Sequence, residues 1–481
     1  MNTLHDLAQA IDGRLLSADA TRDGTTVPVG RIVIDSRQVE PGDLFWALKG
    51  PNHDGADFVG EAFHRGAVAV VAAKRADVPD GHRAVEVDDT YRALYQWARF
   101  KRRQFTGTVI AVTGSVGKTT TRQMIHTVLR TRLTGTASPR NYNNHIGLPM
   151  SMFAIEPDHH YAVLELGASR PGEIAALAEL CAPKVGVVTQ IADVHLSGFG
   201  SRQAIADAKA ELLAALPSEG RAVLGDDVQL RNVANMCDAQ IIWVGADQTC
   251  DVRAVRVKSK AGRLTFRVVI RNAAEHAEPA TASHSTVGPE FCVPVWGRHH
   301  VTSALAAVAV GRMMGLELSE MAEALKRFQP VPMRCEVLEM RGATVINDTY
   351  NSNPTAMRAA LELIRDFDAS GRRIVVSGDM AELGRESIAS HWRLGKETVS
   401  LGGAELLIAC GRFARHVVAG ARAAGMPHAR AVPCETADDA LPYLGQAIQP
   451  GDVVLVKGSR NMAMERVIEA LERFPERRRG A

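Results

Sequence analysis

The stretch from Thr113 to Thr120 constrains the fold of this chain more than any other part of the sequence. It reads Thr-Gly-Ser-Val-Gly-Lys-Thr-Thr, follows the apolar run 108–112 and precedes an amphipathic segment that contains Met124 and Val128. This order predicts a strand, a glycine-rich turn and a helix. Glycines let backbone N–H groups close around phosphate oxygens, and the start of a helix adds a positive dipole end. The stretch therefore predicts a phosphate-binding loop.

Two side chains of this loop carry the expected chemistry. Lys118 is placed to meet the outer phosphates of a nucleoside triphosphate, and the Thr119 hydroxyl to bind Mg²⁺. The usual pattern has a glycine five positions before Gly117, where this chain has Val112, so we expect Gly114 to make the bend in a tighter variant. A purely structural glycine turn is the alternative, and the strand-to-helix context favours phosphate binding.

Length and composition limit the class of protein. A chain of 481 residues is too long for one ordinary core and predicts about two to four domains. The formal net charge of +2 gives no reason to expect nucleic acid or an anionic membrane as partner. The seven cysteines are scattered without a CxxC pair, so we expect reduced thiols rather than disulfides or a zinc site.

No segment has the pattern of a membrane span or a signal peptide. The longest apolar stretch, 304–310, is too short to cross a bilayer. Asp6 and Asp12 interrupt the region where a signal peptide would begin. We therefore expect a soluble, cytoplasmic protein.

The chain divides into three segments, which we predict to be domains. Residues 1–105 alternate short apolar strands with helices. Residues 106–328 contain the phosphate loop and nearly continuous apolar runs at 108–113, 161–166 and 185–191. Residues 329–481 begin after the Pro330 and Pro332 breakers and have predicted strands at 343–347, 373–377, 405–409 and 452–456.

Apolar runs that alternate with helical patterns are typical of a parallel sheet covered on both faces. We therefore predict an α/β protein of three domains, with a central P-loop-type parallel sheet domain and a C-terminal Rossmann-like domain. The polar stretch 271–290 is predicted to be an exposed loop of the central domain.

Two polar residues follow central strands at the edge where ligands bind in open parallel sheets. Glu165 lies within the apolar run 161–166, and a buried carboxylate there needs a partner or a metal ion. We favour a Mg²⁺ ligand over a salt-bridged structural glutamate, because Mg²⁺ prefers hard oxygen ligands. His195 lies just beyond the strand that ends near Ile191, and its position suits a metal ligand and a structural histidine equally.

Lys209 lies on a predicted helix between Ser201 and Pro217. It comes four residues after Ile205 and three before Leu212, so it faces the apolar side of that helix. Such a lysine loses its proton, pairs with a hydrogen-bond acceptor or an anionic group, or extends its amine to solvent. The residues alone favour the extended amine. The alternative is a neutral amine that has captured CO₂ as a carbamate, which would be an anionic metal ligand.

Six stretches of the sequence form a recognisable set: 112–120, 164–168, 192–196, 208–211, the segment from Asp348 to Pro354, and 457–460. Together they resemble the ATP-dependent Mur ligases, which attach successive amino acids to the peptidoglycan precursor in the bacterial cytoplasm. The resemblance covers nearly the whole chain. It implies ATP and Mg²⁺ as cofactors and amide-bond formation through an acyl phosphate.

Four stretches point to one branch of this family: 35–37 together with 42–45, 141–144, 347–351 and 378–384. They resemble the ligases that join D-alanyl-D-alanine to UDP-N-acetylmuramoyl-tripeptide. The resemblance implies those two substrates, and we expect a monomer with no nucleic-acid partner and no membrane insertion. The branch that adds the third residue typically carries Tyr-Ala-His-Thr-Pro at 350–354, where this chain has Tyr-Asn-Ser-Asn-Pro.

The resemblance implies a role for each residue that matches a family motif. The ATP site comprises Gly114, Ser115, Val116, Gly117, Lys118, Thr119, Thr120, Arg334 and Asp348. The metal ligands are Thr119, Glu165, His195 and Lys209, the last as a carbamate, and the catalytic residues are Lys118, Lys209, His195 and Glu165. Substrate contacts come from Ser36, Arg37, Asn143, Asn144, Ser169, Asn351 and Asn353.

One stretch departs from the family pattern, which has His-Asn and a second Asn three residues later. Here His300 and Ser303 stand at the two asparagine positions. We assign His299 and His300 to the ATP site.

Two other functions fit part of the pattern. The first is a ligase of similar build with another acceptor, either the third-residue ligase or a folylpolyglutamate synthetase, although the stretch 35–37 argues against the folate enzyme. The second is a nucleotide-dependent regulatory module that hydrolyses ATP without ligation.

Overall fold

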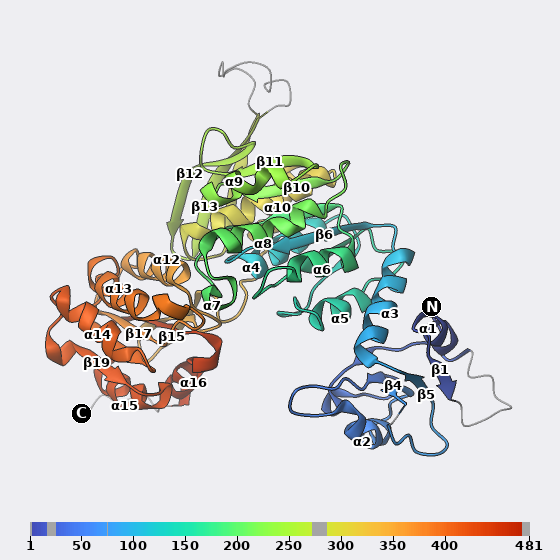
Figure 1. Cartoon of the computed structure of the whole chain (residues 1–481). Helices are drawn as coiled ribbons and strands as arrows, with labels where there is room; N and C mark the ends of the chain where they lie inside the picture. The colour runs from blue at the N-terminus through green and yellow to red at the C-terminus, as the bar shows by residue number, and fades with distance from the viewer. Residues whose placement is uncertain (1, 17–25, 75, 272–285, 474–481) are drawn as a thin grey trace. The chain divides into compact units, whose positions relative to one another are not determined.

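A computed structural model describes residues 2–16, 26–74, 76–271 and 286–473 (Figure 1). Within these ranges the chain forms three β-sheets with helices packed on them. Its internal contacts divide it into two compact units. The first unit comprises Met1–Val109, Thr134–Leu164 and Ala176–Ala182, and the second comprises Ile110–Leu133, Glu165–Ala175 and Pro183–Ala481.

The first sheet lies in the first unit and has the strand order β1-β5-β4-β3-β2. Its strands are β1 Arg14–Leu16, β2 Ile32–Val33, β3 Leu44–Trp46, β4 Ala69–Ala73 and β5 Ala84–Val87, and only β1 is antiparallel to its neighbour. The accompanying helices are α1 Leu4–Ala10, α2 Val59–His64 and α3 Thr90–Gln104. Alternate residues of a strand point to opposite faces, and accordingly Leu44 and Phe45 belong to two different hydrophobic clusters.

The central sheet has nine strands in the order β14-β13-β12-β11-β10-β9-β6-β8-β7. They are β6 Thr108–Thr113, β7 Gly135–Ala137, β8 Tyr161–Glu165, β9 Val185–Val188, β10 Arg221–Gly225, β11 Gln240–Gly245, β12 Val252–Lys260, β13 Arg263–Ile270 and β14 Thr286–Val293. The helices are α4 Lys118–Leu129, α5 Gly147–Phe153, α6 Glu173–Cys181, α7 Leu196–Phe199, α8 Arg202–Ala214, α9 Val228–Val233, α10 Val301–Met313 and α11 Leu318–Lys326.

Strands β12, β13 and β14 pair antiparallel and extend the otherwise parallel sheet at one side. The expected exposed loop over 271–290 is therefore wrong in its last part, because residues 286–290 belong to β14. Residues 272–285 of that stretch lie outside the described residues. In β14 the burial alternates irregularly, so its polar composition hid the strand pattern.

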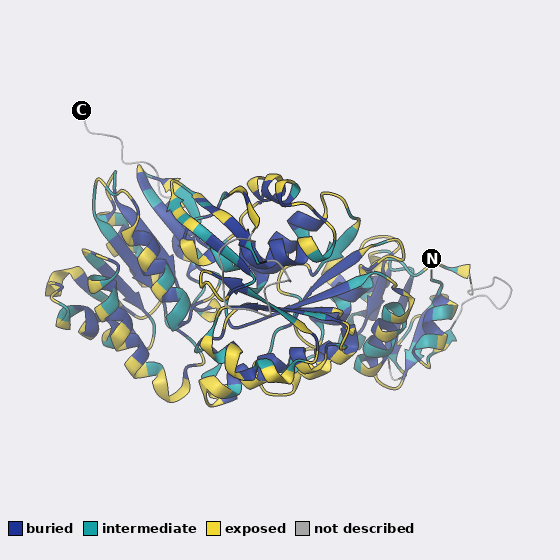
Figure 2. Ribbon diagram, turned by 90° about the horizontal axis from the view of Figure 1, so that it is seen from above, coloured by how far each residue is buried: buried dark blue, intermediate teal, exposed yellow. Residues whose placement is uncertain are grey.

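The C-terminal sheet has the order β15-β16-β20-β17-β18-β19. Its strands are β15 Glu336–Met340, β16 Ala343–Asp348, β17 Arg373–Ser377, β18 Leu406–Cys410, β19 Ala431–Cys434 and β20 Val453–Lys457, and only β15 is antiparallel. The helices are α12 Pro354–Arg365, α13 Ser387–Ser400, α14 Ala414–Ala423, α15 Ala437–Ala447 and α16 Glu465–Arg473. Hydrophobic clusters cover both faces, and the strands appear as buried ribbons in Figure 2.

The predicted α/β class is confirmed, with a parallel-dominated central sheet and a C-terminal sheet of Rossmann-like alternation. The exact domain boundaries at 105 and 328 stay a prediction. All seven cysteines are free thiols in the structure. Among the described residues, no helix combines the length and the apolar character that a membrane crossing needs.

Candidate active site

The phosphate loop connects β6 to α4, as its sequence pattern predicts. Gly114 has a φ of +140° and Gly117 a φ of +82°, a region of backbone conformation that favours glycine. Gly117 is the N-cap residue of α4, so the loop ends where the helix dipole begins. The Ser115 N–H donates to the Gln190 carbonyl at 2.8 Å, which holds the loop against the segment after β9.

Replacing Gly114 with Ala is expected to disrupt this loop. A Cβ at Gly114 would lie 2.0 Å from the Thr189 Oγ1 atom, and the positive φ adds backbone strain. We expect ADP affinity to fall at least about tenfold and stability to fall by roughly 1–3 kcal/mol. Calorimetric titration and thermal melting measure the two effects.

Gly172 supplies a matched control, because its φ is +84° but, apart from Gly172 and its two chain neighbours, no described residue has an atom within 4 Å of the place that a Cβ would take. Gly172→Ala therefore tests backbone strain without the collision. Equal losses in the two variants would show that the contact with Thr189 is not the reason for the glycine at 114.

The Lys118 ammonium bends back onto the loop. It donates to the carbonyls of Gly114 at 2.7 Å and Ser115 at 3.3 Å. Burial lowers the pKa of Lys118, the charge of Glu165 opposes this shift, and that of Arg334 adds to it. A desolvated cation that donates to backbone carbonyls is well prepared to bind an anion such as a phosphate.

Glu165 is the last residue of β8, and its side chain is buried. Its Oε2 atom lies 3.9 Å from Nη1 of Arg122, which belongs to α4 and is also buried. A partner for the carboxylate agrees with the structural alternative, but 3.9 Å is long for an ion pair. The role of Glu165 as a Mg²⁺ ligand stays a prediction.

Lys209 lies on α8 and is 1% exposed, so its amine does not extend to solvent as the residues alone favoured. Its Nζ atom lies 3.4 Å from the Ala168 carbonyl oxygen and 5.3 Å from the ring centre of Phe199. Burial, and secondly the charge of Lys118, lower the pKa of Lys209 to about 7. A neutral amine is therefore accessible near neutral pH, which is what carbamate formation requires.

His195 precedes α7 with a left-handed backbone, φ +50°. Its Nδ1 atom contacts the Glu382 carboxylate, and the Ser197 N–H donates to the Glu382 carbonyl at 3.0 Å. These contacts hold His195 against the loop after β17. Its predicted place at a second metal position is not tested by them and stays a prediction.

Two residues of the C-terminal segment extend the site. Arg334 donates to the Thr119 hydroxyl at 3.2 Å, and its guanidinium lies 4.2 Å from the ring centre of Tyr350. The Asp348 carboxylate accepts the Lys457 ammonium at 2.7 Å. Arg334 is thus in contact with the first turn of α4, and its approach to the nucleotide stays a prediction.

His299 and His300 precede α10, with their ring centres 4.1 Å apart. His300 lines a cavity of about 320 Å³ together with Thr120 and Arg334. Ser303 accepts a hydrogen bond from the Thr121 hydroxyl at 2.9 Å. The stretch that departs from the family pattern therefore lies against the phosphate-loop helix.

Several predicted substrate residues have structural partners of their own. Asn353 is the N-cap of α12, where its side chain accepts from the Ala356 N–H at 2.9 Å. Asn351 accepts from the Ser352 N–H, and the Ser169 N–H donates to Glu173. Their roles toward substrate stay predictions.

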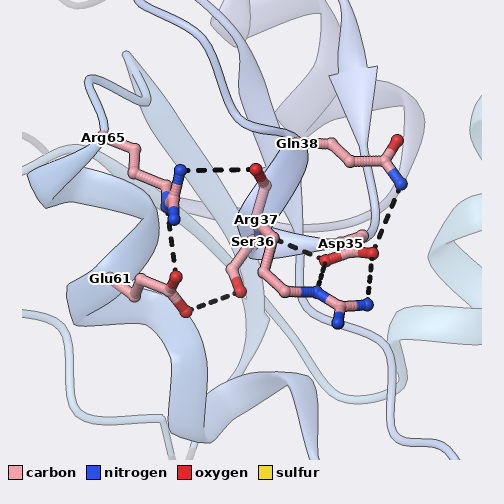
Figure 3. A network of polar contacts seen from close by, with 6 residues as sticks. All are labelled: Asp35, Ser36, Arg37, Gln38, Glu61 and Arg65. Atoms are coloured by element: carbon pink, nitrogen blue, oxygen red, sulfur yellow. Dashed lines mark hydrogen bonds and ion pairs between the residues drawn. The ribbon is translucent and has the colours of Figure 1, made fainter.

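In the first unit, Ser36 and Arg37 belong to a polar network shown in Figure 3. The Ser36 hydroxyl donates to Glu61 at 2.8 Å, and Glu61 also binds Arg65 at 3.1 Å. The Arg37 guanidinium makes two hydrogen bonds to Asp35, both 2.9 Å long. The Arg37 side chain is 79% exposed, so its guanidinium is open to a ligand.

Asn143 and Asn144 are also in the first unit, just before α5. The Asn144 side chain accepts from the N–H groups of Ile146 at 3.1 Å and Gly147 at 2.8 Å. It therefore caps the start of α5, which orders the loop that carries both asparagines.

Within the second unit, the structure brings Lys118, Thr119, Glu165, Lys209 and Arg334 together, through contacts or mutual electrostatic effects. Sequence reasoning assigned no role to Arg122 or to Lys457, although Lys457 begins the stretch 457–460. Arg122 could have been found, because it lies four residues after Lys118 and so on the same face of α4. Lys457 could have been found as a lysine that ends a buried strand.

Three family descriptions match consecutive parts of the chain. Residues 28–102 match the Mur ligase family catalytic domain, 112–311 the Mur ligase middle domain, and 333–460 the Mur ligase glutamate ligase domain. Two enzymes named UDP-N-acetylmuramoyl-tripeptide–D-alanyl-D-alanine ligase, from Bacillus subtilis and Escherichia coli, are each 32% identical to this chain. Each alignment covers 98% of this chain, together with 99% of the Bacillus subtilis enzyme and 98% of the Escherichia coli enzyme. The chain belongs to the Mur ligase family.

Solved structures of Mur ligases have the same fold. A MurF structure from Acinetobacter baumannii has a TM-score of 0.82 and 30% sequence identity, covering 98% of both chains. A MurF ligase from Thermotoga maritima in complex with ADP has a TM-score of 0.75 and 27% identity, covering 93% of this Mur ligase and 98% of its own chain.

Proposed function

We propose that this Mur ligase joins D-alanyl-D-alanine to UDP-N-acetylmuramoyl-tripeptide at the expense of ATP, in the cytoplasmic synthesis of the peptidoglycan precursor. One observation carries the proposal: the phosphate loop holds the Lys118 ammonium through the carbonyls of Gly114 and Ser115, where the charge of Glu165 acts on it and its own charge helps to lower the pKa of Lys209. The names of the relatives, which match over nearly their full length, support this choice of substrates.

The reaction needs an activated carboxylate. A carboxylate resists attack by an amine, because its charge is delocalised and oxide is a very poor leaving group. Transfer of the γ-phosphoryl group of ATP to a carboxylate oxygen gives an acyl phosphate and ADP. The free amine of D-alanyl-D-alanine then attacks the acyl carbon, and the tetrahedral intermediate loses phosphate and a proton to leave the amide.

The residues of the site suit the first of these steps. Charge on a transferring phosphoryl group is stabilised by positioned cations, and the Lys118 ammonium is buried in the phosphate loop. Arg334 adds a second positive charge beside Thr119. The loop and the N-terminus of α4 orient the phosphates by backbone N–H groups.

The donor set around the loop suits Mg²⁺. The Glu165 carboxylate and the Thr119 hydroxyl are hard oxygen ligands, and a carbamate on Lys209 would supply another oxygen with negative charge. When bound, Mg²⁺ would neutralise charge on the phosphate oxygens.

The first unit is proposed to bind the UDP part of the tripeptide substrate. Arg37 is an exposed cation beside the Ser36–Glu61 network, and a guanidinium pairs well with phosphate oxygens. We propose a monomer, without nucleic-acid partners, as the working form.

Mass spectrometry of reaction products tests the proposal. The enzyme is incubated with ATP, Mg²⁺, D-alanyl-D-alanine and UDP-muramoyl tripeptides that carry either diaminopimelate or lysine. We expect a pentapeptide product and ADP release that requires both substrates. A parallel incubation replaces the tripeptides and D-alanyl-D-alanine with UDP-muramoyl dipeptide and a free amino acid, and product formed only there would indicate the third-residue ligase instead. ADP release indifferent to both substrates would indicate a regulatory ATPase.

A further inference from the structure

Three metal-binding side chains, none of them a predicted Mg²⁺ ligand, meet beside the cavity that His300 shares with Thr120 of the phosphate loop. Ligand atoms of His299, His300 and Cys335 all lie within 4.8 Å of one another. The two histidines precede α10, whereas Cys335 follows the linker at 329–334 and precedes β15. Because 34 residues or more separate the cysteine from the histidines, no local spacing in the sequence revealed the cluster.

We propose that His299, His300 and Cys335 form a binding site for a thiophilic divalent metal ion such as Zn²⁺. Two imidazoles and a thiolate are donors that Zn²⁺ favours, and they are poor ligands for Mg²⁺. Binding replaces the thiol proton of Cys335, which leaves to solvent, with a sulfur–metal bond. Three protein ligands leave a fourth position for water.

The cluster is held in place on its buried side. His300 and Cys335 are 9% and 8% exposed, and both line the cavity of about 320 Å³. Cys335 has a left-handed backbone, φ +52°, fixed by its N–H, which donates to the Asp348 carboxylate at 3.2 Å. These contacts restrict the position of the sulfur atom before any metal binds.

The third ligand provides adaptability and access. His299 is exposed and lines a second cavity together with Gly297 and Glu362. Tetrahedral zinc with bond lengths of about 2.0–2.3 Å brings its donor atoms to roughly 3.3–3.6 Å from one another. Rotation of the exposed His299 side chain can supply most of that approach.

Charges near the cluster are mixed. The cations Arg334 and Lys457 would oppose a metal ion, but Asp348 pairs with Lys457 at 2.7 Å, and Arg334 lies over Tyr350. The thiolate supplies a further negative charge when the ion binds. A metal ion here would connect the start of α10 directly to the linker that leads into the C-terminal sheet.

Titration of the nucleotide-free full chain with Co²⁺, in an excess of Mg²⁺ that fills the oxygen-ligand site, tests the proposal. We expect one Co²⁺ per chain, a thiolate-to-cobalt charge-transfer absorption, and displacement of the cobalt by Zn²⁺. Cys335→Ser should lose the charge-transfer absorption, and His299→Ala should weaken Co²⁺ binding at least about tenfold.

Cys237→Ser is the matched control, since Cys237 is a free, half-buried cysteine outside the cluster, and it should keep the wild-type spectrum. Circular dichroism establishes that each variant folds. If Cys335→Ser does not fold, His299→Ala decides, because its side chain is exposed. An absent charge-transfer absorption in the wild type, or an unchanged one in Cys335→Ser, would overturn the site, as would unchanged Co²⁺ affinity in His299→Ala.

Discussion

Lys118→Met should lower kcat by at least about 10²–10³-fold while leaving the protein folded. The ammonium of Lys118 is the cation that the phosphate loop holds at its centre, through the carbonyls of Gly114 and Ser115. Methionine keeps most of the volume of the side chain but cannot stabilise charge on a transferring phosphoryl group. Because the ammonium is desolvated, its removal should not reduce the free energy of unfolding.

Steady-state ADP release and thermal melting separate the two quantities. Lys184→Met is the matched control, because Lys184 is exposed and directly precedes β9, a strand next to β6 in the sheet. The control should retain both activity and melting temperature. Turnover of Lys118→Met within about threefold of wild type would remove Lys118 from phosphoryl transfer, and the proposed mechanism would then lack its central cation.

Local patterns predicted the parts of the fold that repeat a regular period. The strands at 108–113, 343–347 and 373–377 are recognisable because both faces of a parallel sheet are covered and the middle of each run is mainly apolar. The antiparallel strands β12–β14 were not predicted, because their exposed faces carry charged and polar residues such as Lys258 and Glu290. There the pairing partner, and not the local sequence, specifies the strand.

In the candidate site, too, local features could be predicted from the sequence and contacts between distant segments could not. The loop at 113–120 is local, so its residue types and order define its chemistry. The ion pair of Arg122 with Glu165 and the cluster of His300 with Cys335 join distant segments. Such contacts depend on topology, which residue spacing does not contain.

The burial of Lys209 exceeds what its sequence position predicts, for a related reason. Its helical position showed only that it faces the apolar side of α8, and a long side chain can often reach solvent from such a position. In the fold, Phe199 and the segment that contains Ala168 close over the amine. The tertiary contacts, and not the helix pattern, remove the route to solvent.

Lys209→Met is expected to abolish most activity and yet stabilise the fold. The wild-type pKa in the folded state, about 7, lies below the value of 10.5 for an unperturbed lysine. The unfolded chain therefore binds more protons between these two pH values, and wild-type stability rises with pH across that window. Methionine carries no such penalty, so its advantage in melting temperature should be full near and below pH 7 and disappear toward pH 10.5.

Loss of activity in Lys209→Met should reach about 10²-fold, if the neutral amine adds CO₂ to give a carbamate and a proton and the carbamate holds Mg²⁺. Incubation with ¹³C-labelled bicarbonate should give a carbamate NMR signal in the wild type and in the exposed-site control Lys260→Met, but none in Lys209→Met. Melting curves in CO₂-free buffer isolate the effect of the bare amine. Wild-type turnover in Lys209→Met would exclude the carbamate from catalysis. A melting temperature of Lys209→Met below that of the wild type near pH 7 would show that the amine has a stabilising partner and is not a desolvated cation. The two readouts are independent, because one follows the metal-binding form of the side chain and the other its protonation.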